Sequence, residues 1–340
     1  MTDAATRAPR IVLLAGGAGG SAFAVGLRDV VRERAGELTV ICNTADDWWL
    51  AGLRIQPDVD SMLYGLAGAK DTTKGWGRAG DSLRVAGELQ AWGATPPWFE
   101  LGDLDLGAHI ARTSWLRAGA TPSVVLERLQ ARWADEIGAR LLPMTDAEVE
   151  THVVLDDTDN PENPETIHFQ EWWTRYRAKR EPRSFTNPGM ATATPAPGVL
   201  EAIAGADVVL IAPSNPIVSI GPILAVPGVR EAVASTPAPV VGVSPIIGGA
   251  PVRGMADVCL RVAGVECSAA GVAAHFGARS QATGVQGAGL LDAWLIAEED
   301  ASSQPAIEAL GLAAPVRPLW MRGPELTRAL ASDALAAAGL

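Results

Sequence analysis

Continuous apolar runs along the chain predict the strands of a buried sheet. Four such runs end in glycine, proline or polar residues: Ile11–Ala15, Leu38–Cys42, Asp207–Ala212 and Pro239–Val243. Strands that are apolar on both faces are typical of parallel sheets with helices on each side. The start and the end of the chain are therefore predicted to form one α/β unit.

The segment between the first two strands has the pattern of a helix. Phe23, Leu27, Val30 and Val31 recur at helical spacing, and Ser21 is the expected N-cap. Strand, helix and strand together form a βαβ unit, which places its two strands parallel to each other.

The middle of the chain follows a different pattern. Residues 82–92 and 122–133 have helical spacing, while Thr151–Asp157 and Ile167–Trp173 have the pattern of an antiparallel strand pair. We therefore predict an α/β fold with a doubly wound, mostly parallel sheet and an inserted smaller mixed α/β subdomain. The nucleotide-binding core is assigned to residues 1–72 and 186–340, and the inserted substrate subdomain to residues 73–185.

Composition and charge exclude several classes of protein. The 340 residues are 48% apolar, which excludes an intrinsically disordered chain, and the net charge of −12 argues against nucleic-acid or membrane-surface binding. The three cysteines show no CxxC spacing, and no apolar run reaches the ~20 residues of a membrane span. The N-terminus lacks the apolar core of a signal peptide, so a cytoplasmic location is expected.

A glycine-rich loop follows the first strand. Gly16, Gly17, Gly19 and Gly20 would let the backbone approach a phosphate at the N-terminus of the next helix. The loop lacks a Walker lysine, which disfavours an ordinary P-loop NTPase. The alternative is a tight strand-to-helix turn with no ligand.

Four aspartates follow the second strand. Asp46 and Asp47 lie in the loop directly after it, and Asp58 and Asp60 follow about a dozen residues later. Because loops at the carboxyl ends of parallel strands converge, these carboxylates are expected near the glycine loop, where Mg²⁺ could separate them from a diphosphate. The alternative is a solvated loop in which Asp60 caps a helix beginning at Ser61.

A third polar segment follows the strand at 207–212. Ser214 and Asn215 could donate hydrogen bonds to a phosphate or a base, or they could serve as turn and helix-capping residues. A weaker cluster lies at 102–112, where Asp103 and His109 are either a polar pair or residues at a helix start.

Taken together, these segments resemble a known family over about residues 10–295. The chain is similar to the 2-phospho-L-lactate transferase family of coenzyme F420 biosynthesis, and most similar to its actinobacterial phosphoenolpyruvate transferase branch. The resemblance rests on AGGAGGSAFAVGL, CNTADDWWLAGLRIQPDVDSMLYGLAG, WFELGDLDLGAHIARTSWLRAG, IHFQEWWTRYRA, APSNPIVSIGPILAVPGVR and SPIIGGAPVRGMAD. One departure is Leu104, where relatives tend to carry arginine in a GDRD motif.

The resemblance implies a Rossmann-like fold, a homodimer and a defined reaction. The ribityl hydroxyl of the deazaflavin Fo would attack a guanosine-diphosphate-activated donor carrying lactyl or enolpyruvyl, releasing GMP and giving F420-0 or its dehydro form. The glycine loop would hold the guanylyl half, and Mg²⁺ would bind the aspartates. The residues implied are Gly16, Gly17, Gly19, Gly20, Asn43, Ser214 and Asn215 for the nucleotide, and Asp46 and Asp60 for the metal and catalysis.

The resemblance leaves other points open. Trp48, Trp49 or Trp76 could stack on the flat deazaflavin or simply pack. A nucleotide- or nucleotide-sugar-binding regulatory protein of the same superfamily is the first alternative. A nicotinamide-dependent oxidoreductase is the second, and it is disfavoured because the sequence shows no catalytic Tyr–Lys or His–Asp pairing.

Overall fold

The computed structural model describes residues 7–155, 164–279 and 289–340. Among these residues, six parallel strands form the main sheet in the order β13-β10-β9-β1-β2-β5. Their bounds are β1 Arg10–Ala15, β2 Glu37–Cys42, β5 Arg140–Pro143, β9 Val208–Ile211, β10 Val240–Val243 and β13 Ala293–Leu295. The four predicted strands and the mostly parallel sheet are confirmed.

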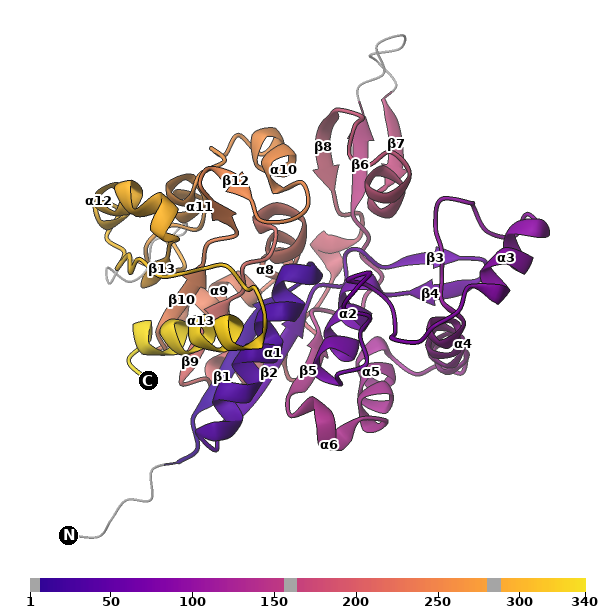
Figure 1. The fold of residues 1–340 in the computed structure, drawn as a ribbon, viewed down its shortest axis with the longest axis horizontal. Helices are drawn as coiled ribbons and strands as arrows, with labels where there is room; N and C mark the ends of the chain where they lie inside the picture. Colours follow the sequence, from indigo (N-terminus) through magenta and orange to yellow (C-terminus); the bar gives the residue numbers. More distant parts are fainter. Residues whose placement is uncertain (1–6, 156–163, 280–288) are drawn as a thin grey trace.

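Both faces of this sheet are covered, as the continuous apolar runs predict. Along β1, Ile11, Leu13 and Ala15 belong to the core on one face, while Val12 and Leu14 belong to the core on the other. Figure 1 shows α1 and α13 side by side in front of the sheet. The first core includes residues of α1 Gly17–Glu33, α2 Pro57–Leu66, α5 Pro122–Ala131, α6 Ala134–Ile137 and α13 Pro324–Ala337.

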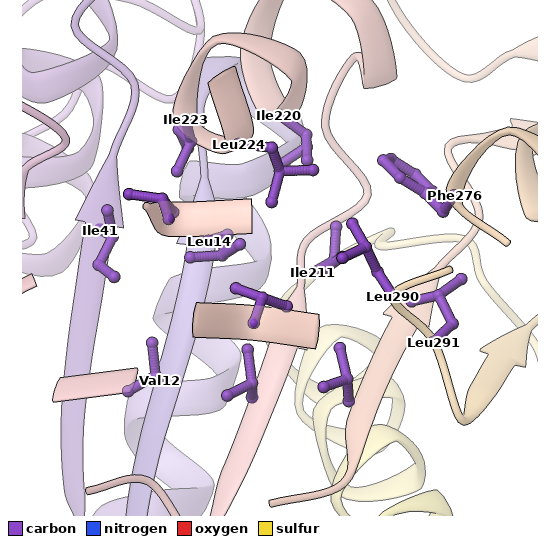
Figure 2. Close-up of a cluster of buried hydrophobic side chains, with 14 of the residues drawn as sticks. Val12, Leu14, Ile41, Ile211, Ile220, Ile223, Leu224, Phe276, Leu290 and Leu291 are labelled. Atoms are coloured by element: carbon purple, nitrogen blue, oxygen red, sulfur yellow. The ribbon is translucent and has the colours of Figure 1, made fainter. Parts of the chain in front are cut away.

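The second core lies on the opposite face of the sheet. Figure 2 shows Val12, Leu14, Ile41 and Ile211 from three neighbouring strands packed against residues of the covering segments. Truncating a fully buried side chain such as Leu14 to alanine would cost about 2–5 kcal/mol. The helices on this face are α7 Val199–Ala204, α8 Gly221–Ala225, α9 Val229–Ser235, α10 Ala256–Val262, α11 Ala269–Phe276 and α12 Gln304–Glu308.

The middle of the chain contributes one strand to the main sheet and several smaller elements. β5 pairs with β2, so the stretch assigned to the insertion shares the core sheet. The division at residues 73 and 185 stays a prediction. The two predicted helices are confirmed as α3 Arg84–Ala91 and α5, and α4 Asp103–Arg117 lies between them. Two short hairpins are β3 Trp48–Leu50 with β4 Leu53–Ile55, and β11 Ile246–Ile247 with β12 Ala250–Pro251.

A separate antiparallel sheet confirms the predicted strand pair and adds to it. β6 His152–Leu155 pairs with β7 Glu165–His168 and also with β8 Pro182–Thr186, which the sequence pattern did not reveal. The end of the strand predicted at Ile167–Trp173 is wrong, because Glu171–Arg175 forms a π-helical turn that buries Trp172. The last two residues of the strand predicted at Thr151–Asp157 lie outside the described residues.

Several short turns complete the chain. A second π-helical turn spans Pro216–Ile220, and 3₁₀ turns span Met190–Thr192 and Glu298–Ser303. Over the described residues no single helix is long and apolar enough to cross a membrane. Residues 216–225 and 229–235 reach the required length and composition only as a pair, with a 90° bend between them.

Candidate active site

The predicted site residues other than Asp60 lie at the carboxyl ends of β1, β2 and β9, while Asp60 lies in α2. The chain runs from β1 outward to β2 and β5, and returns on the other side of β1 as β9, β10 and β13. The strand order therefore reverses between β1 and β9. In open α/β sheets, ligands bind in the crevice at such a reversal. The glycine loop follows β1, and the Ser214–Asn215 segment follows β9.

Ser214 connects these two loops. Its hydroxyl donates a hydrogen bond of 2.6 Å to the Gly16 carbonyl, and the Gly16 N–H donates to the same hydroxyl at 3.2 Å. Ser214 is buried, so these bonds satisfy polar groups that water does not reach. The side chain predicted to bind a ligand therefore holds the two loops together.

The glycines allow close packing within the protein. A Cβ on Gly19 would lie 2.6 Å from the Pro213 carbonyl oxygen, and one on Gly20 would lie 2.5 Å from the Ser214 hydroxyl. Gly17 is different: its φ is +65°, and a Cβ there would have only one described neighbour within 4 Å, the Ser219 Oγ atom at 3.8 Å. Of these three glycines, Gly17 is the one with open space beside it.

Helix α1 begins at Gly17, five residues before Ala22, which follows the predicted N-cap. Ser21 is therefore not its N-cap, and that prediction is wrong. The Ser21 hydroxyl instead donates to the Ser61 carbonyl at 2.7 Å and joins α1 to α2. The Gly17 N–H, at the first turn of α1, donates to the Asp58 carboxylate. The N-terminus of the helix therefore faces a carboxylate of the protein itself.

Asn215 has a structural role among the described residues. Its side-chain oxygen accepts hydrogen bonds from the N–H groups of Ile217 and Val218, at 3.0 and 3.3 Å, and caps the turn that follows. Its side chain also bonds to the Cys259 thiol. The capping interpretation is confirmed, and ligand binding by Asn215 stays a prediction.

Asn43 links two of the four aspartates. Its amide nitrogen lies 2.9 Å from Asp58 Oδ2 and 3.4 Å from Asp46 Oδ1. Burial and the negative charges of Asp58 and Asp47 raise the pKa of Asp46 well above its ordinary value. Burial also raises the pKa of Asp58, although the hydrogen bonds from Asn43 and Gly17 oppose that shift. Ionised Asp46 is therefore short of compensating positive charge.

Asp47 interacts electrostatically with both Asp46 and Asp60. Burial raises the pKa of Asp47 to about 7, even though Arg54 and a hydrogen bond from Gln56 stabilise its charged form. The Arg54 Nη2 atom is 3.8 Å from Asp47 Oδ2. The other carboxylate oxygen, Oδ1, is buried without a hydrogen-bond partner among the described residues.

Asp60 forms a buried ion pair with Arg112. Arg112 Nη2 donates to Asp60 Oδ1, while the His109 ring lies 3.6 Å from Asp60 Oδ2. Burial lowers the pKa of His109 to about 4, so this ring is neutral near pH 7. Asp60 lies within α2, which starts at Pro57, so the idea that it caps a helix starting at Ser61 is wrong. Its Oδ2 atom is buried, and no described residue forms a hydrogen bond with it.

Asp46 and Asp60 are the carboxylates predicted to hold Mg²⁺. Within the described ranges, no group of three or more His, Cys, Asp or Glu side chains has a geometry that could hold a metal. Mg²⁺ is commonly held by one or two carboxylates together with substrate phosphates. Uncompensated Asp46 and the free Asp60 Oδ2 atom are the kind of donors that such an ion would use. The assignment of Asp46 and Asp60 to a metal stays a prediction.

The tryptophans differ in what they can contact. The Trp48 ring is stacked against Trp98 at 5.8 Å and against His168 at 5.3 Å, which confirms a packing role for it. Trp49 and Trp76 are each 41% exposed. Arg54 lies over the Trp49 ring at 5.7 Å, and Lys74 over the Trp76 ring at 5.5 Å.

The cluster at 102–112 divides into two parts. Asp103 accepts hydrogen bonds from the Ser82 hydroxyl and the Val85 N–H and caps the start of α3, while Asp81 caps α4 in the same way. This confirms that Asp103 is a helix-start residue. His109 instead contacts Arg112, which pairs with Asp60. Because Arg112 and Asp60 are 52 residues apart, no local sequence pattern indicates this pair.

Two small cavities accompany these elements. One of about 30 Å³ is lined by Thr44, Asp47, Arg54 and Gln56 among others, and it is large enough for a water molecule. The other, of about 250 Å³, lies between α5 and α6 at Ala131 and away from the aspartates. The smaller cavity is the one that borders the site.

Comparison with known proteins gives a consistent result. The family model for 2-phospho-L-lactate transferase CofD matches residues 11–311. A phosphoenolpyruvate transferase of Nocardia farcinica is 48% identical over 332 residues, covering 98% of this chain and 96% of the relative. One from Thermobifida fusca is 51% identical, covering 96% and 97%. A solved Bacillus halodurans protein of the upf0052 family superposes with a TM-score of 0.60 at 15% identity, covering 97% and 99%, and supports the fold alone.

Proposed function

The chain belongs to the 2-phospho-L-lactate transferase family of coenzyme F420 biosynthesis, and on that premise we propose that it transfers a phospho-three-carbon-acid group to the deazaflavin Fo. The donor is a guanosine-diphosphate-activated acid. Phosphoenolpyruvyl is favoured over 2-phospho-L-lactyl, because relatives about half identical to this chain are named phosphoenolpyruvate transferases. The cytoplasmic location and the homodimer stay predictions.

One observation carries the proposal at the level of the site. Buried carboxylates, Asp46 above all, lie at the strand-order reversal beside the N-terminus of α1, where a nucleotide diphosphate would bind. In the proposed reaction the ribityl hydroxyl oxygen of Fo bonds to the phosphorus that carries the three-carbon acid. The bond from that phosphorus to the GMP oxygen breaks, and the hydroxyl proton leaves.

The roles of the residues follow from their surroundings. The Gly17 region of the α1 N-terminus would receive the diphosphate, with Ser214 holding the loop in shape. Asp46 and Asp60 would hold Mg²⁺, which supplies positive charge to the phosphate oxygens as the bond to GMP breaks. Arg112 fixes the orientation of Asp60, and Asp58 is held by Asn43 and Gly17. An aspartate that does not bind the metal, such as Asp47, could accept the hydroxyl proton.

The acceptor would lie on an exposed aromatic surface. Trp48 already stacks against Trp98 and His168, so the more exposed Trp49 and Trp76 are the favoured candidates of the three for contact with the deazaflavin. Three cations are the candidates to replace the arginine missing at Leu104. Lys74 and Arg78 lie in the segment after α2, and Arg112 is already paired with Asp60. Leu104 itself is 42% exposed and near the start of α4.

Fo binding tests this function against the first alternative. Quenching of Fo fluorescence on titration with the protein, in the presence of GDP and Mg²⁺, is expected for the transferase. A nucleotide-binding regulatory protein would bind GDP and leave Fo fluorescence unchanged. That result would remove the transferase proposal.

A further inference from the structure

Two cations lie close together without a negative partner of their own. Lys70 lies four residues after the end of α2, and its N–H donates to the Tyr64 carbonyl at 3.1 Å. Arg253 lies in the loop that follows β12. Over the residues that the structure describes, neither side chain forms an ion pair or a side-chain hydrogen bond.

The turn after Lys70 contacts Arg253. Lys70 forms an isolated antiparallel bridge with Arg78, so residues 70–78 fold back on themselves. Gly75 lies inside this turn, and a Cβ there would be 2.8 Å from Arg253 Nη2. The Arg253 guanidinium therefore packs against the turn that Lys70 opens.

The pKa of Lys70 reflects the charged groups around it. Burial, followed by the positive charge of Arg253, lowers the pKa of Lys70, and the negative charge of Asp58 opposes the shift. The positive charge of Arg253 therefore lies close enough to act on Lys70. Asp58 is already held by the Asn43 amide and the Gly17 N–H, so it does not serve as a dedicated partner.

This arrangement is unusual in a chain with a net charge of −12. Two other basic side chains of the site have carboxylate partners: Arg54 pairs with Glu150, and Arg112 with Asp60. Two like charges held side by side repel each other, and an anion placed between them would reverse the sign of that interaction. Lys70 comes from the β2 side of the strand-order reversal and Arg253 from the β10 side, so such an anion would lie across the crevice.

We propose that Lys70 and Arg253 form a clamp for an anionic group of the donor, either a phosphate or a carboxylate. The inference rests on the proposed function and adds the residues that receive the charged end of the donor. The aspartates repel a ligand with a diphosphate and a carboxylate, and the clamp supplies two positive charges beside them. Because the cations come from opposite sides of the crevice, the ligand would join the two halves of the site.

Charge-neutral variants test the clamp. Lys70→Gln, Arg253→Gln and the double variant are compared with Lys179→Gln and Arg183→Gln, which remove exposed cations near the antiparallel sheet. Calorimetry measures the binding of GDP and of enolpyruvyl-diphospho-guanosine, with Mg²⁺ and without Fo, so that no transfer occurs. Each clamp variant is expected to weaken donor binding about tenfold, and the double variant more.

Comparing the binding of the two ligands identifies which anionic group of the donor the clamp binds. Parallel losses for GDP and for the donor assign a phosphate to the clamp, while a loss for the donor alone assigns its carboxylate. The affinity of the double variant is also expected to fall less steeply with salt than that of the wild type. Melting temperatures without ligand are expected to stay at or above the wild-type value, because a repulsive pair has been removed.

Opposite results would overturn the clamp. If the Lys70 and Arg253 variants bind both ligands within twofold of wild type, or if the control variants lose as much affinity, the clamp is wrong. Wild-type protein that binds the donor but transfers nothing to Fo would remove the proposed function and leave the clamp in place. If the wild-type protein transfers the group to Fo while the clamp variants bind the donor as tightly as the wild type, the clamp is wrong and the proposed function stands.

Discussion

Arg112 has no exposed surface, and it donates a hydrogen bond to Asp60 from 52 residues further along the chain. The pair joins α4 to α2, and Arg112 also donates to the Arg54 carbonyl at 3.2 Å, which fixes the end of the β3–β4 hairpin. A carboxylate assigned to metal binding is thus also a structural partner. The two carboxylate oxygens of Asp60 differ in their partners. Oδ1 accepts a hydrogen bond from Arg112, while Oδ2 accepts none from the described part of the chain.

Asp60→Asn is therefore expected to lower stability as well as activity. Removing one charge of a buried pair leaves the other without compensation, at a cost of about 3 kcal/mol. The free energy of unfolding, measured in urea, is expected to fall by that amount. The double variant Asp60→Asn with Arg112→Met is expected to recover part of the loss.

An exposed pair provides the control. Arg317 and Asp333 form an ion pair with side chains 44% and 32% exposed. Arg317→Gln is expected to change the free energy of unfolding by less than about 1 kcal/mol. Equal losses for Asp60→Asn and Arg317→Gln would show that the buried pair has no special role.

Asp46→Asn is expected to behave differently from Asp60→Asn. Burial and the charges of Asp58 and Asp47 raise the pKa of Asp46, so its ionised form opposes folding at neutral pH. The variant should melt at or above the wild-type temperature, yet lose Mg²⁺-dependent GMP release by roughly a hundredfold or more. Wild-type turnover by the folded variant would remove Asp46 from the metal site.

Gly19→Ala is expected to disturb the loop itself. The new Cβ would lie 2.6 Å from the Pro213 carbonyl oxygen, which is backbone and cannot rotate away. A loss of about 1–3 kcal/mol is expected from this overpacking. Gly107→Ala in the middle of α4 is the matched control, because no described atom outside its own helix turn lies within 4 Å of its Cβ position. Similar melting temperatures for the two variants would contradict the close approach.

His168→Phe is expected to flatten the dependence of stability on pH. Burial lowers the pKa of His168 to about 4, below its ordinary value of 6.5. As the pH falls, His168 is protonated in the unfolded chain before it is protonated in the folded protein. The free energy of unfolding therefore decreases as the pH falls from about 6.5 toward 4. Phenylalanine keeps a ring against Trp48 and does not titrate. Unfolding free energies across pH 4–7 should fall less steeply in the variant than in the wild type, and identical slopes would contradict the assignment.

Much of the fold could be predicted from local sequence patterns. β1, β2, β9 and β10 are continuous apolar runs because both faces of the sheet are covered. β5 has no comparable signal, because it is only four residues long and lies among helices. Apolar and polar residues still alternate over residues 167–170, so the local pattern does not indicate that the strand ends at His168, before the π-helical turn at Glu171–Arg175.

The site could be predicted less completely, because its partners are distant in sequence. The sequence indicates that the glycine loop and the aspartates lie at the same end of the sheet. It does not reveal that Ser214 binds the backbone of Gly16, 198 residues away. The pairing of Asp60 with Arg112 and the contact of Arg253 with the turn at Gly75 also depend on tertiary packing.

The central claim is the transfer of a phospho-three-carbon-acid group to Fo, and product analysis tests it most directly. The protein is mixed with Fo, Mg²⁺ and either lactyl- or enolpyruvyl-diphospho-guanosine, and products are identified by mass spectrometry. The account predicts F420-0 or its dehydro form together with an equal amount of GMP, and neither product when EDTA replaces Mg²⁺. Intact Fo and intact donor after incubation with folded protein and Mg²⁺ would contradict it.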